Sequence, residues 1–308
     1  MDKKINLENF TTFKIGQEPK AFFSVSNIEN IKSIFDLIKE EKYFVLGGGS
    51  NILVSPSIKD YNILRIENRS VKIESNIITV GAGEYLSFLV NTAIENNLKG
   101  LEWAAGIPGT IGGAIFGNSG SFLGEIKDNL ESITVFDINL KEVKILSNKD
   151  CNFSYRNSIF KENKNKYIIL SAEFRLNIVD NNYEIRKIYN ENLEKKRKTQ
   201  PIGEFSAGCV FKNVEYDENN LELVSFLANY EENNLFKLKK QIPTAFLIDK
   251  LGLKGLKMGE AEISSIHANF IINNGKANYE DVIGLIALIK KEVKENLDVE
   301  LEEEIEII

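Results

Sequence analysis

A glycine-dense segment constrains this chain more than any other part of its sequence. Residues 102–120 read EWAAGIPGTIGGAIFGNSG, with glycines at positions 106, 109, 112, 113, 117 and 120. Glycine lets the backbone approach a ligand closely and adopt positive φ. The backbone N–H groups of such a loop can then point at an anion. The segment therefore predicts a binding loop for a negatively charged ligand.

A second glycine cluster lies upstream and directly follows an apolar run at residues 43–46. It consists of Gly47, Gly48, Gly49, Ser50 and Asn51. A flexible loop would explain one cluster, but it explains two clusters beside predicted strands poorly. Together they predict a dinucleotide whose diphosphate is bound from two sides. The first cluster lacks the GxGxxG-then-helix context, so we do not expect a Rossmann fold.

Composition excludes several classes of site and partner. A length of 308 residues predicts two domains, or three small ones. The net charge of -7 argues against nucleic acid as the main partner. His267 is the single histidine, which leaves no basis for a metal site built on histidine. Two cysteines, Cys151 and Cys209, favour a reducing cytoplasm over a disulfide framework. No signal core or membrane-spanning run is present, so we expect no membrane insertion.

Hydrophobic periodicity predicts an α+β chain. Asn27 is the expected cap of a helix whose apolar residues run from Ile28 to Ile38. Further helices are expected at 84–97, 183–199, 244–251 and 279–296. Strands are expected at 43–46, 52–54, 61–66, 71–74, 77–80, 133–137, 141–146, 167–178, 209–211, 269–272 and 299–308. Residues 200–203 read QPIG, and this proline and glycine after a predicted helix mark the expected domain boundary.

Six ordered motifs together resemble one family of flavoenzymes. They span nearly the whole chain and read NFTTFKIG at 9–16, LGGGSN at 46–51, GIPGTIGG at 106–113, YRNS at 155–158, SAGCVFKN at 206–213 and HANF at 267–270. In this order and spacing they resemble the UDP-N-acetylenolpyruvoylglucosamine reductase (UDP-N-acetylmuramate dehydrogenase) family. No room exists between residues 178 and 200 for the tyrosine-bearing loop of the longer form, so the chain resembles the shorter form.

The resemblance implies a fold and a division into domains. It implies an FAD-binding fold of the p-cresol methylhydroxylase type over residues 1–199, with subdomains at about 1–56 and 57–199. A smaller α+β substrate-binding domain is expected at 200–296. A C-terminal strand at 297–308 is expected to carry a catalytic glutamate.

The resemblance also implies a reaction in the synthesis of peptidoglycan precursors, and hence in cell-wall biogenesis, cell shape and division. NADPH reduces a non-covalently bound FAD, and the flavin gives hydride to the enolpyruvyl ether of UDP-N-acetylglucosamine. An enolate forms and is protonated, which yields UDP-N-acetylmuramate. No metal is implied.

Individual residues match the family's functional positions. Arg156 matches the catalytic arginine, whose fixed fork can hold the substrate carboxylate and stabilise the enolate. Cys209 lies where many members have the proton-donating serine, although a small buried cysteine is the alternative. Glu304 matches the catalytic glutamate, with Glu303 where the family has proline. Glu300 and Glu302 are expected to face solvent.

The remaining site residues follow from the same motifs. The residues expected to bind FAD are Gly47, Gly48, Gly49, Ser50, Asn51, Gly106, Pro108, Gly109, Thr110, Gly112 and Gly113. Tyr155, Lys212 and Asn213 are expected to bind substrate. His267 has either a structural role or a ligand contact.

Two other functions compete with this interpretation. One is another FAD-dependent oxidoreductase of the same superfamily, in which FAD is often attached through histidine or cysteine. The other is a non-catalytic nucleotide-binding module. The first fits poorly because His267 lies outside the flavin region, and the second because Arg156, Cys209 and a suitable glutamate occur together.

Overall fold

The computed structural model describes residues 5–38, 40–122 and 124–308. These residues form two compact units. The first unit takes in the described part of residues 1–5 together with 18–49 and 57–198. The second takes in 6–17, 50–56 and 199–308. Two short stretches from the first sixty residues therefore belong with the C-terminal part of the chain, while the functional division at 199 and 296 stays a prediction.

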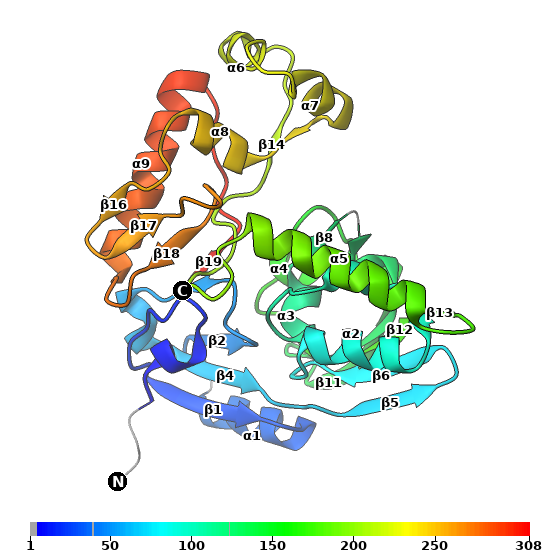
Figure 1. The fold of residues 1–308 in the computed structure, drawn as a ribbon. Helices are drawn as coiled ribbons and strands as arrows, with labels where there is room; N and C mark the ends of the chain where they lie inside the picture. The colour runs from blue at the N-terminus through cyan, green and yellow to red at the C-terminus, as the bar shows by residue number, and fades with distance from the viewer. Residues whose placement is uncertain (1–4, 39, 123) are drawn as a thin grey trace. The chain divides into compact units, whose positions relative to one another are not determined.

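A small parallel sheet forms one part of the first unit (Figure 1). Its strand order is β1-β4-β2, from β1 (Ala21–Val25), β4 (Asn62–Ile66) and β2 (Tyr43–Leu46). Helix α1 (Ile28–Ile38) joins β1 to β2, and the Asn27 side chain accepts the Asn30 N–H at 2.9 Å, as expected of the cap. Parallel strands end at a common edge, which is the usual ligand position. The first glycine cluster follows β2 at this edge.

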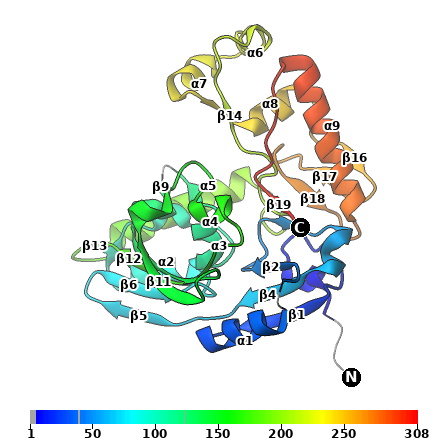
Figure 2. The same ribbon diagram turned by 180° about the vertical axis from the view of Figure 1, so that it is seen from behind.

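An antiparallel sheet of five strands forms the other part of the first unit (Figure 2). Its strand order is β11-β10-β12-β6-β5. The strands are β5 (Val71–Glu74), β6 (Ile77–Gly81), β10 (Leu130–Asp137), β11 (Glu142–Ser147) and β12 (Tyr167–Arg175). Two separate two-stranded sheets also belong to this unit: β7–β13 (Leu98–Lys99, Asn177–Ile178) and β8–β9 (Gly120–Ser121, Gly124–Glu125).

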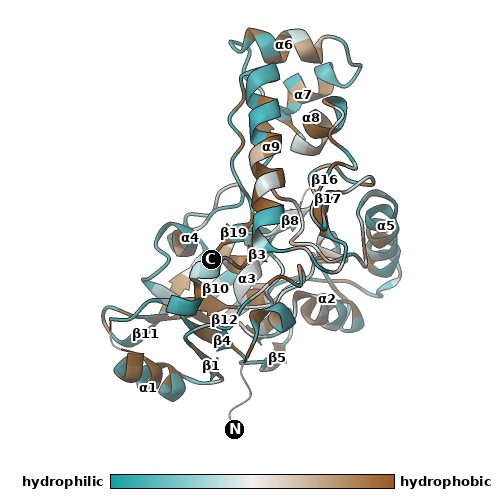
Figure 3. Cartoon of the chain, turned by 90° about the vertical axis from the view of Figure 1, so that its left-hand side faces the viewer, coloured by the Kyte–Doolittle hydropathy of each residue, from teal (hydrophilic) through white to brown (hydrophobic). Residues whose placement is uncertain are grey.

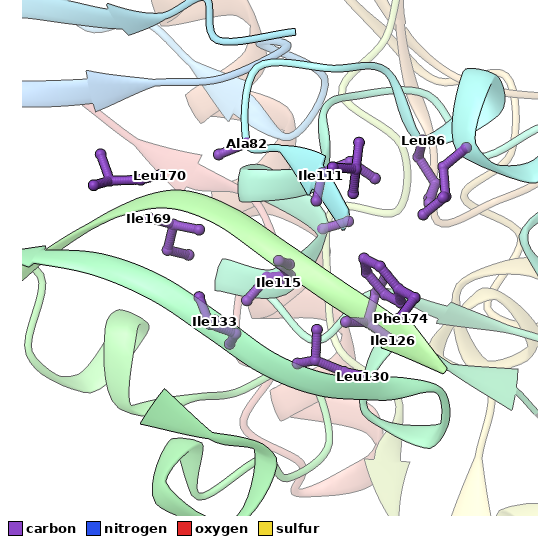
Figure 4. Packing of buried hydrophobic residues seen from close by; sticks show 14 of the residues in the cluster. Ala82, Leu86, Ile111, Ile115, Ile126, Leu130, Ile133, Ile169, Leu170 and Phe174 are labelled. Carbon is purple, nitrogen blue, oxygen red and sulfur yellow. The ribbon is translucent and has the colours of Figure 1, made fainter. Parts of the chain in front are cut away.

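Four α-helices follow α1 among the described residues of this unit, and one of them, α3, packs the glycine-dense segment on the antiparallel sheet. They are α2 (Leu86–Glu95), α3 (Ile111–Phe116), α4 (Ile159–Glu162) and α5 (Tyr183–Thr199). Helix α3 lies within the glycine-dense segment and packs on β6 and β12. Figure 4 shows Ile111 and Ile115 of α3 in one cluster with Ile133 and Ile169 of the sheet. The segment is thus a short helix held by a buried core, with glycine loops on both sides of it.

The second unit has its own hydrophobic core. Its helices are α6 (Leu221–Leu227), α7 (Asn233–Lys239), α8 (Thr244–Lys250) and α9 (Tyr279–Leu297). Its strands are β3 (Ile52–Leu53), β14 (Val214–Glu215), β15 (Gln241–Ile242), β16 (Lys257–Met258), β17 (Ala261–Ile263), β18 (Ile271–Asn273) and β19 (Glu306–Ile307). Figure 3 shows hydrophobic and hydrophilic stripes along α9, and its apolar stripe is buried. Phe13, Ile15 and Leu53 join this core, which explains why their segments belong to the unit.

The observed elements confirm the α+β class and correct three predicted strands. The strand expected at 167–178 ends at Arg175 in β12, because residues 177–178 form β13 and pair with β7 instead. Residues 209–211 form no strand, because Cys209 bridges to Phe270 whereas Phe211 bridges to Glu303. The predicted terminal strand 299–308 is regular only in β19. Instead of a continuous ladder, its earlier backbone accepts one hydrogen bond from the Lys212 N–H and donates two to the Val210 carbonyl, from Glu304 and Ile305. Within the described part of the chain, no helix is both long and apolar enough to cross a membrane.

Candidate functional site

The two predicted glycine loops meet in the first unit. A Cβ atom on Gly48 would lie 2.7 Å from the Gly109 Cα atom, so only glycine fits there. A Cβ on Gly47 would lie 2.6 Å from the Thr110 Oγ1 atom. Gly106 and Gly109 have φ of 68° and 108°, which non-glycine residues rarely adopt. The two loops, which the sequence predicts to bind one diphosphate from two sides, therefore lie against each other.

An unsatisfied hydroxyl lies where the loops meet. Thr110 is 4 % exposed, and its Oγ1 atom has no hydrogen-bond partner among the described residues. A buried hydroxyl normally has a partner. Backbone amides of closely packed glycines beside such a hydroxyl form a cradle that suits an oxygen-rich anion. These residues fit the diphosphate of a dinucleotide.

The Gly48→Ala substitution tests this contact. The added methyl group would overlap the Gly109 backbone, so we expect a loss of stability of about 1–3 kcal/mol and loss of most bound flavin. The ratio of flavin to protein absorbance and a thermal melt measure the two effects. Gly117→Ala is the matched control, because its Cβ would meet only the Gly113 carbonyl oxygen, at 3.8 Å. Full flavin content in Gly48→Ala would refute the close contact.

Ser50 and Asn51 continue the first loop but belong to the second unit. The Asn51 Nδ2 atom donates to the Glu304 carbonyl at 3.1 Å, and its carbonyl accepts the Glu306 N–H at 2.9 Å. The structure therefore brings Asn51 to the C-terminal segment that carries the candidate glutamate. Nothing in the sequence indicated this pairing.

Arg156 occupies a strained turn of the first unit. Its φ is 52°, in the left-handed region, and Ser154 and Asn157 exchange two backbone hydrogen bonds across it, each of 3.2 Å. Its Nη2 atom donates to the Gly120 carbonyl at 2.9 Å. Its guanidinium carbon lies 5.1 Å from the centre of the Tyr155 ring. Strained backbone of this kind persists only where surrounding contacts hold it, and it is concentrated at functional sites.

The SAGCVFKN segment lies in the second unit and adjoins the C-terminal segment. The Val210 N–H donates to the Asn269 carbonyl at 2.8 Å, and the Val210 carbonyl accepts the Glu304 N–H at 2.7 Å. Cys209 is partly exposed and is not in a disulfide. The backbone next to Cys209 is therefore hydrogen-bonded to the backbone of Glu304. The catalytic roles of the two side chains stay predictions. Arg156 belongs to the other compact unit.

Lys212 and Asn213 are both engaged within the fold. The Lys212 ammonium pairs with the Glu302 carboxylate. The Asn213 Oδ1 atom accepts the Thr244 N–H at 3.3 Å, at the start of α8. Their predicted contact with substrate stays a prediction.

The C-terminal segment departs from the family motif at Glu303, and the structure gives that residue a partner. Lys290 of α9 donates to the Glu303 carboxylate at 2.6 Å, with both side chains partly buried. The side chains of Glu300 and Glu302 are 80 % and 71 % exposed, so their predicted solvent-facing role is confirmed. The ion pair between Lys290 and Glu303 thus attaches the C-terminal segment to α9 at the position where the family motif has a proline.

His267 is partly buried in the second unit. Its ring makes an edge contact with Phe270 at 4.8 Å, and its Nδ1 atom is buried without a hydrogen-bond partner among residues that the structure describes. Burial, with a smaller contribution from Lys254, lowers the pKa of His267. The ring of His267 thus packs against Phe270, and a contact between His267 and a ligand stays a prediction.

The lowered pKa of His267 predicts a pH dependence of stability. The unfolded chain binds a proton near pH 6.5 whereas the folded chain resists it, so stability falls as the pH drops below about 6.5. His267 is the single histidine, and the carboxylates titrate at lower pH. Urea melts at about pH 7.5 and about pH 5.5 should show the loss in the wild type and little of it in His267→Gln. An equal loss in both proteins would contradict the assignment.

Sequence reasoning missed Asn118, a buried residue that contacts the Arg156 turn. Its side chain is hydrogen-bonded to the Ser154 carbonyl, 36 residues away in sequence. The available signal was a lone polar residue within an apolar and glycine-rich segment.

Comparisons with known proteins agree with the geometry. Residues 200–308 match the C-terminal domain of UDP-N-acetylenolpyruvoylglucosamine reductase, and residues 19–144 match an FAD binding domain. The reductase of Clostridium novyi is 36% identical over 99% of this chain and 91% of its own length. That of Caldicellulosiruptor bescii is 40% identical over 98% of this chain and 88% of its own length. The crystal structure of the Thermus caldophilus reductase superposes with a TM-score of 0.78 at 31% identity, covering 99% of this chain and 98% of that chain.

Proposed function

Because the chain belongs to the UDP-N-acetylenolpyruvoylglucosamine reductase family, we propose that it reduces the enolpyruvyl ether of UDP-N-acetylglucosamine to UDP-N-acetylmuramate, with NADPH as reductant. The product is a peptidoglycan precursor. The observation that carries the proposal is the contact between the two glycine loops at the buried Thr110 hydroxyl, within a chain that matches the family over its full length. Membership of this family favours the reductase activity over the two competing functions, another FAD-dependent oxidoreductase and a non-catalytic nucleotide-binding module.

The chain is an FAD-containing oxidoreductase, and its first unit holds the residues that suit the cofactor. Gly47, Gly48, Gly109 and Thr110 would hold the diphosphate through backbone N–H groups and the hydroxyl. Bound FAD supplies two-electron transfer from the nicotinamide to the substrate. The lack of a histidine in this unit supports non-covalent binding.

Three side chains carry the chemistry of the substrate in this proposal. Hydride adds to the methylene carbon of the enolpyruvyl group, and the electron pair of the double bond moves onto the neighbouring carbon and its carboxylate. Arg156 binds that carboxylate through its fork and stabilises the enolate. Cys209 donates the proton that completes the reduction, because a neutral thiol is a stronger acid than a hydroxyl. Glu304 assists in stabilising the enolate.

Tyr155, Lys212 and Asn213 are proposed to contact the substrate. Tyr155 stacks on the Arg156 guanidinium, which supports a place beside the substrate carboxylate. We also propose that the enzyme acts in the cytoplasm. The two cysteines outside any disulfide and the nucleotide-sugar substrate support that location.

Product analysis tests the proposed function. The purified chain, incubated with NADPH and UDP-N-acetylenolpyruvoylglucosamine, should form a product that is heavier by two hydrogens and co-elutes with UDP-N-acetylmuramate. Acid treatment should release all of the flavin as FAD. Unchanged substrate in the presence of bound, reducible flavin would refute the substrate, and flavin that precipitates with the chain would refute non-covalent binding.

A further inference from the structure

We propose that Asn118 is a positioning residue, which aims the Arg156 guanidinium at the substrate carboxylate. This inference rests on the proposed function, because it assumes the role that we assign to Arg156. It goes further by naming the residue that fixes the geometry of that arginine.

Asn118 uses its whole amide inside the first unit. The side chain is fully buried, with 0% exposure, and its backbone has φ of 44°. Its Nδ2 atom donates to the Glu125 carboxylate at 2.8 Å and to the Ser154 carbonyl at 2.9 Å. Its Oδ1 atom accepts the Lys127 N–H at 3.3 Å. Asparagine tolerates left-handed backbone better than most residues, so this position favours it.

The segments that Asn118 joins are those that hold Arg156 at both ends. Ser154 lies two residues before Arg156 and closes its turn through the backbone bonds with Asn157. Gly120 lies two residues after Asn118 and accepts the hydrogen bond from the guanidinium. Asn118 therefore fixes both the backbone that carries the arginine and the hairpin that receives its side chain. Left-handed backbone at Arg156 needs such external support.

Gly120 of β8 and Gly124 of β9 are both closely packed. A Cβ atom on Gly120 would lie 2.8 Å from the Gly124 carbonyl oxygen and 3.2 Å from the Arg156 Nη1 atom. Gly124 lies directly on the Trp103 ring, where a Cβ would overlap it. Glu125 also pairs with the Lys127 ammonium at 2.9 Å. The backbone around the arginine's acceptor is thus closely packed, and Asn118 links it to the turn through its hydrogen bonds to Glu125 and Ser154.

Asn62 provides a matched control in the same unit. It is 2 % exposed, and its Nδ2 atom donates to the Glu41 carboxylate at 2.8 Å and to the Lys42 carbonyl at 3.1 Å. Its two donor bonds, to a carboxylate and to a backbone carbonyl, therefore match those of Asn118. It begins strand β4, at the opposite end of the strand from the sheet edge where the first glycine cluster follows β2. A purely structural role for Asn118 predicts the same consequences from both positions.

The substitution Asn118→Asp is the main test. It keeps the shape, removes both donors and places a second carboxylate against Glu125. Because displacement of a positioned group by about 1 Å can cost on the order of 10²-fold, we expect reoxidation of the reduced flavin by the enolpyruvyl substrate to slow roughly 10- to 100-fold. Flavin reduction by NADPH should stay within about twofold of wild type. The dissociation constant for UDP-N-acetylmuramate, measured by calorimetry, should rise as well.

Two further variants keep the proposal testable. Glu125→Gln in the Asn118→Asp background supplies an amide donor to the new carboxylate and should recover part of the lost rate. Asn118→Gly adopts the left-handed backbone without strain and removes only the side chain, so it serves if the aspartate variant does not fold. It should show the same selective defect.

The outcomes separate this inference from the proposed function. Slowing in Asn118→Asp but not in Asn62→Asp supports positioning. Equal slowing of both half-reactions, or the same defect in Asn62→Asp, overturns it. Arg156→Ala is the reference: a wild-type rate there refutes the role of Arg156 itself. A slow Arg156→Ala together with a wild-type Asn118→Asp overturns only the inference about Asn118.

Discussion

Arg156→Lys is expected to slow the transfer of reducing equivalents to the substrate by roughly 10²–10³-fold, while flavin reduction by NADPH stays close to wild type. Lysine keeps the charge but loses the planar fork that holds a carboxylate at two points. It also loses the bond to the Gly120 carbonyl, which depends on the reach of the guanidinium. Stopped-flow traces of the two half-reactions measure the effect.

Glu304→Gln should produce the same selective defect as Arg156→Lys. The matched control for Arg156→Lys is Arg175→Lys, because Arg175 forms an exposed ion pair with Glu131 on the antiparallel sheet. That variant should leave both half-reactions unchanged. Equal slowing of both half-reactions in Arg156→Lys would indicate a defect in folding or flavin binding instead. A normal Glu304→Gln beside a slow Glu303→Gln would move the catalytic glutamate by one position.

Cys209→Ala is expected to block turnover after the flavin has been reduced. A positioned acid typically contributes 10²–10⁴-fold, so reoxidation by substrate should slow by roughly that factor. Cys209→Ser should remain active, because the family accepts serine there and the enolate is basic enough to take its proton. Single-turnover reoxidation of the reduced variants distinguishes the two substitutions.

Cys151 is the natural control for this experiment. It is fully buried, its thiol donates to the Ser147 carbonyl at 3.3 Å, and burial raises the pKa of Cys151 to about 12. Cys151→Ala should lower stability and leave both half-reactions alone. Wild-type reoxidation in Cys209→Ala would remove Cys209 from the mechanism.

Long periodic elements were predictable from the sequence because their patterns are local. The cap at Asn27 and the apolar spacing after it define α1, and the apolar run at 43–46 is β2. The two glycine loops were also predictable, since clustered glycines destabilise helices and strands and favour turns and close backbone approach. Their direct contact at Gly48 and Gly109 agrees with the diphosphate that both were predicted to bind.

The elements that the sequence did not predict depend on tertiary contacts. Helix α3 contains Gly112 and Gly113, which disfavour a helix, and it forms because Ile111 and Ile115 are buried against the sheet. Residues 209–211 look like a strand, yet successive residues pair with different segments. The last ten residues likewise hydrogen-bond to two separate segments in turn, residues 210–212 and then residues 51–55.

Site residues divide in the same way. Motifs predicted catalytic roles for Arg156, Cys209 and Glu304, which stay predictions, but no local pattern indicated that Asn51 contacts the backbone of Glu304. Nor did any pattern indicate that Asn118 supports Ser154 from 36 residues away. Positioning residues of this kind act through hydrogen bonds between distant segments, so a single sequence carries little trace of them.

The spectrum of the bound flavin under anaerobic conditions tests the central claim most directly. We predict that the purified protein is yellow, that one equivalent of NADPH bleaches it, and that UDP-N-acetylenolpyruvoylglucosamine restores the oxidised spectrum in a stoichiometric amount. UDP-N-acetylglucosamine, which lacks the enolpyruvyl group, should leave the flavin reduced. A flavin that stays bleached with the enolpyruvyl sugar nucleotide and reoxidises only when oxygen is admitted would contradict the account.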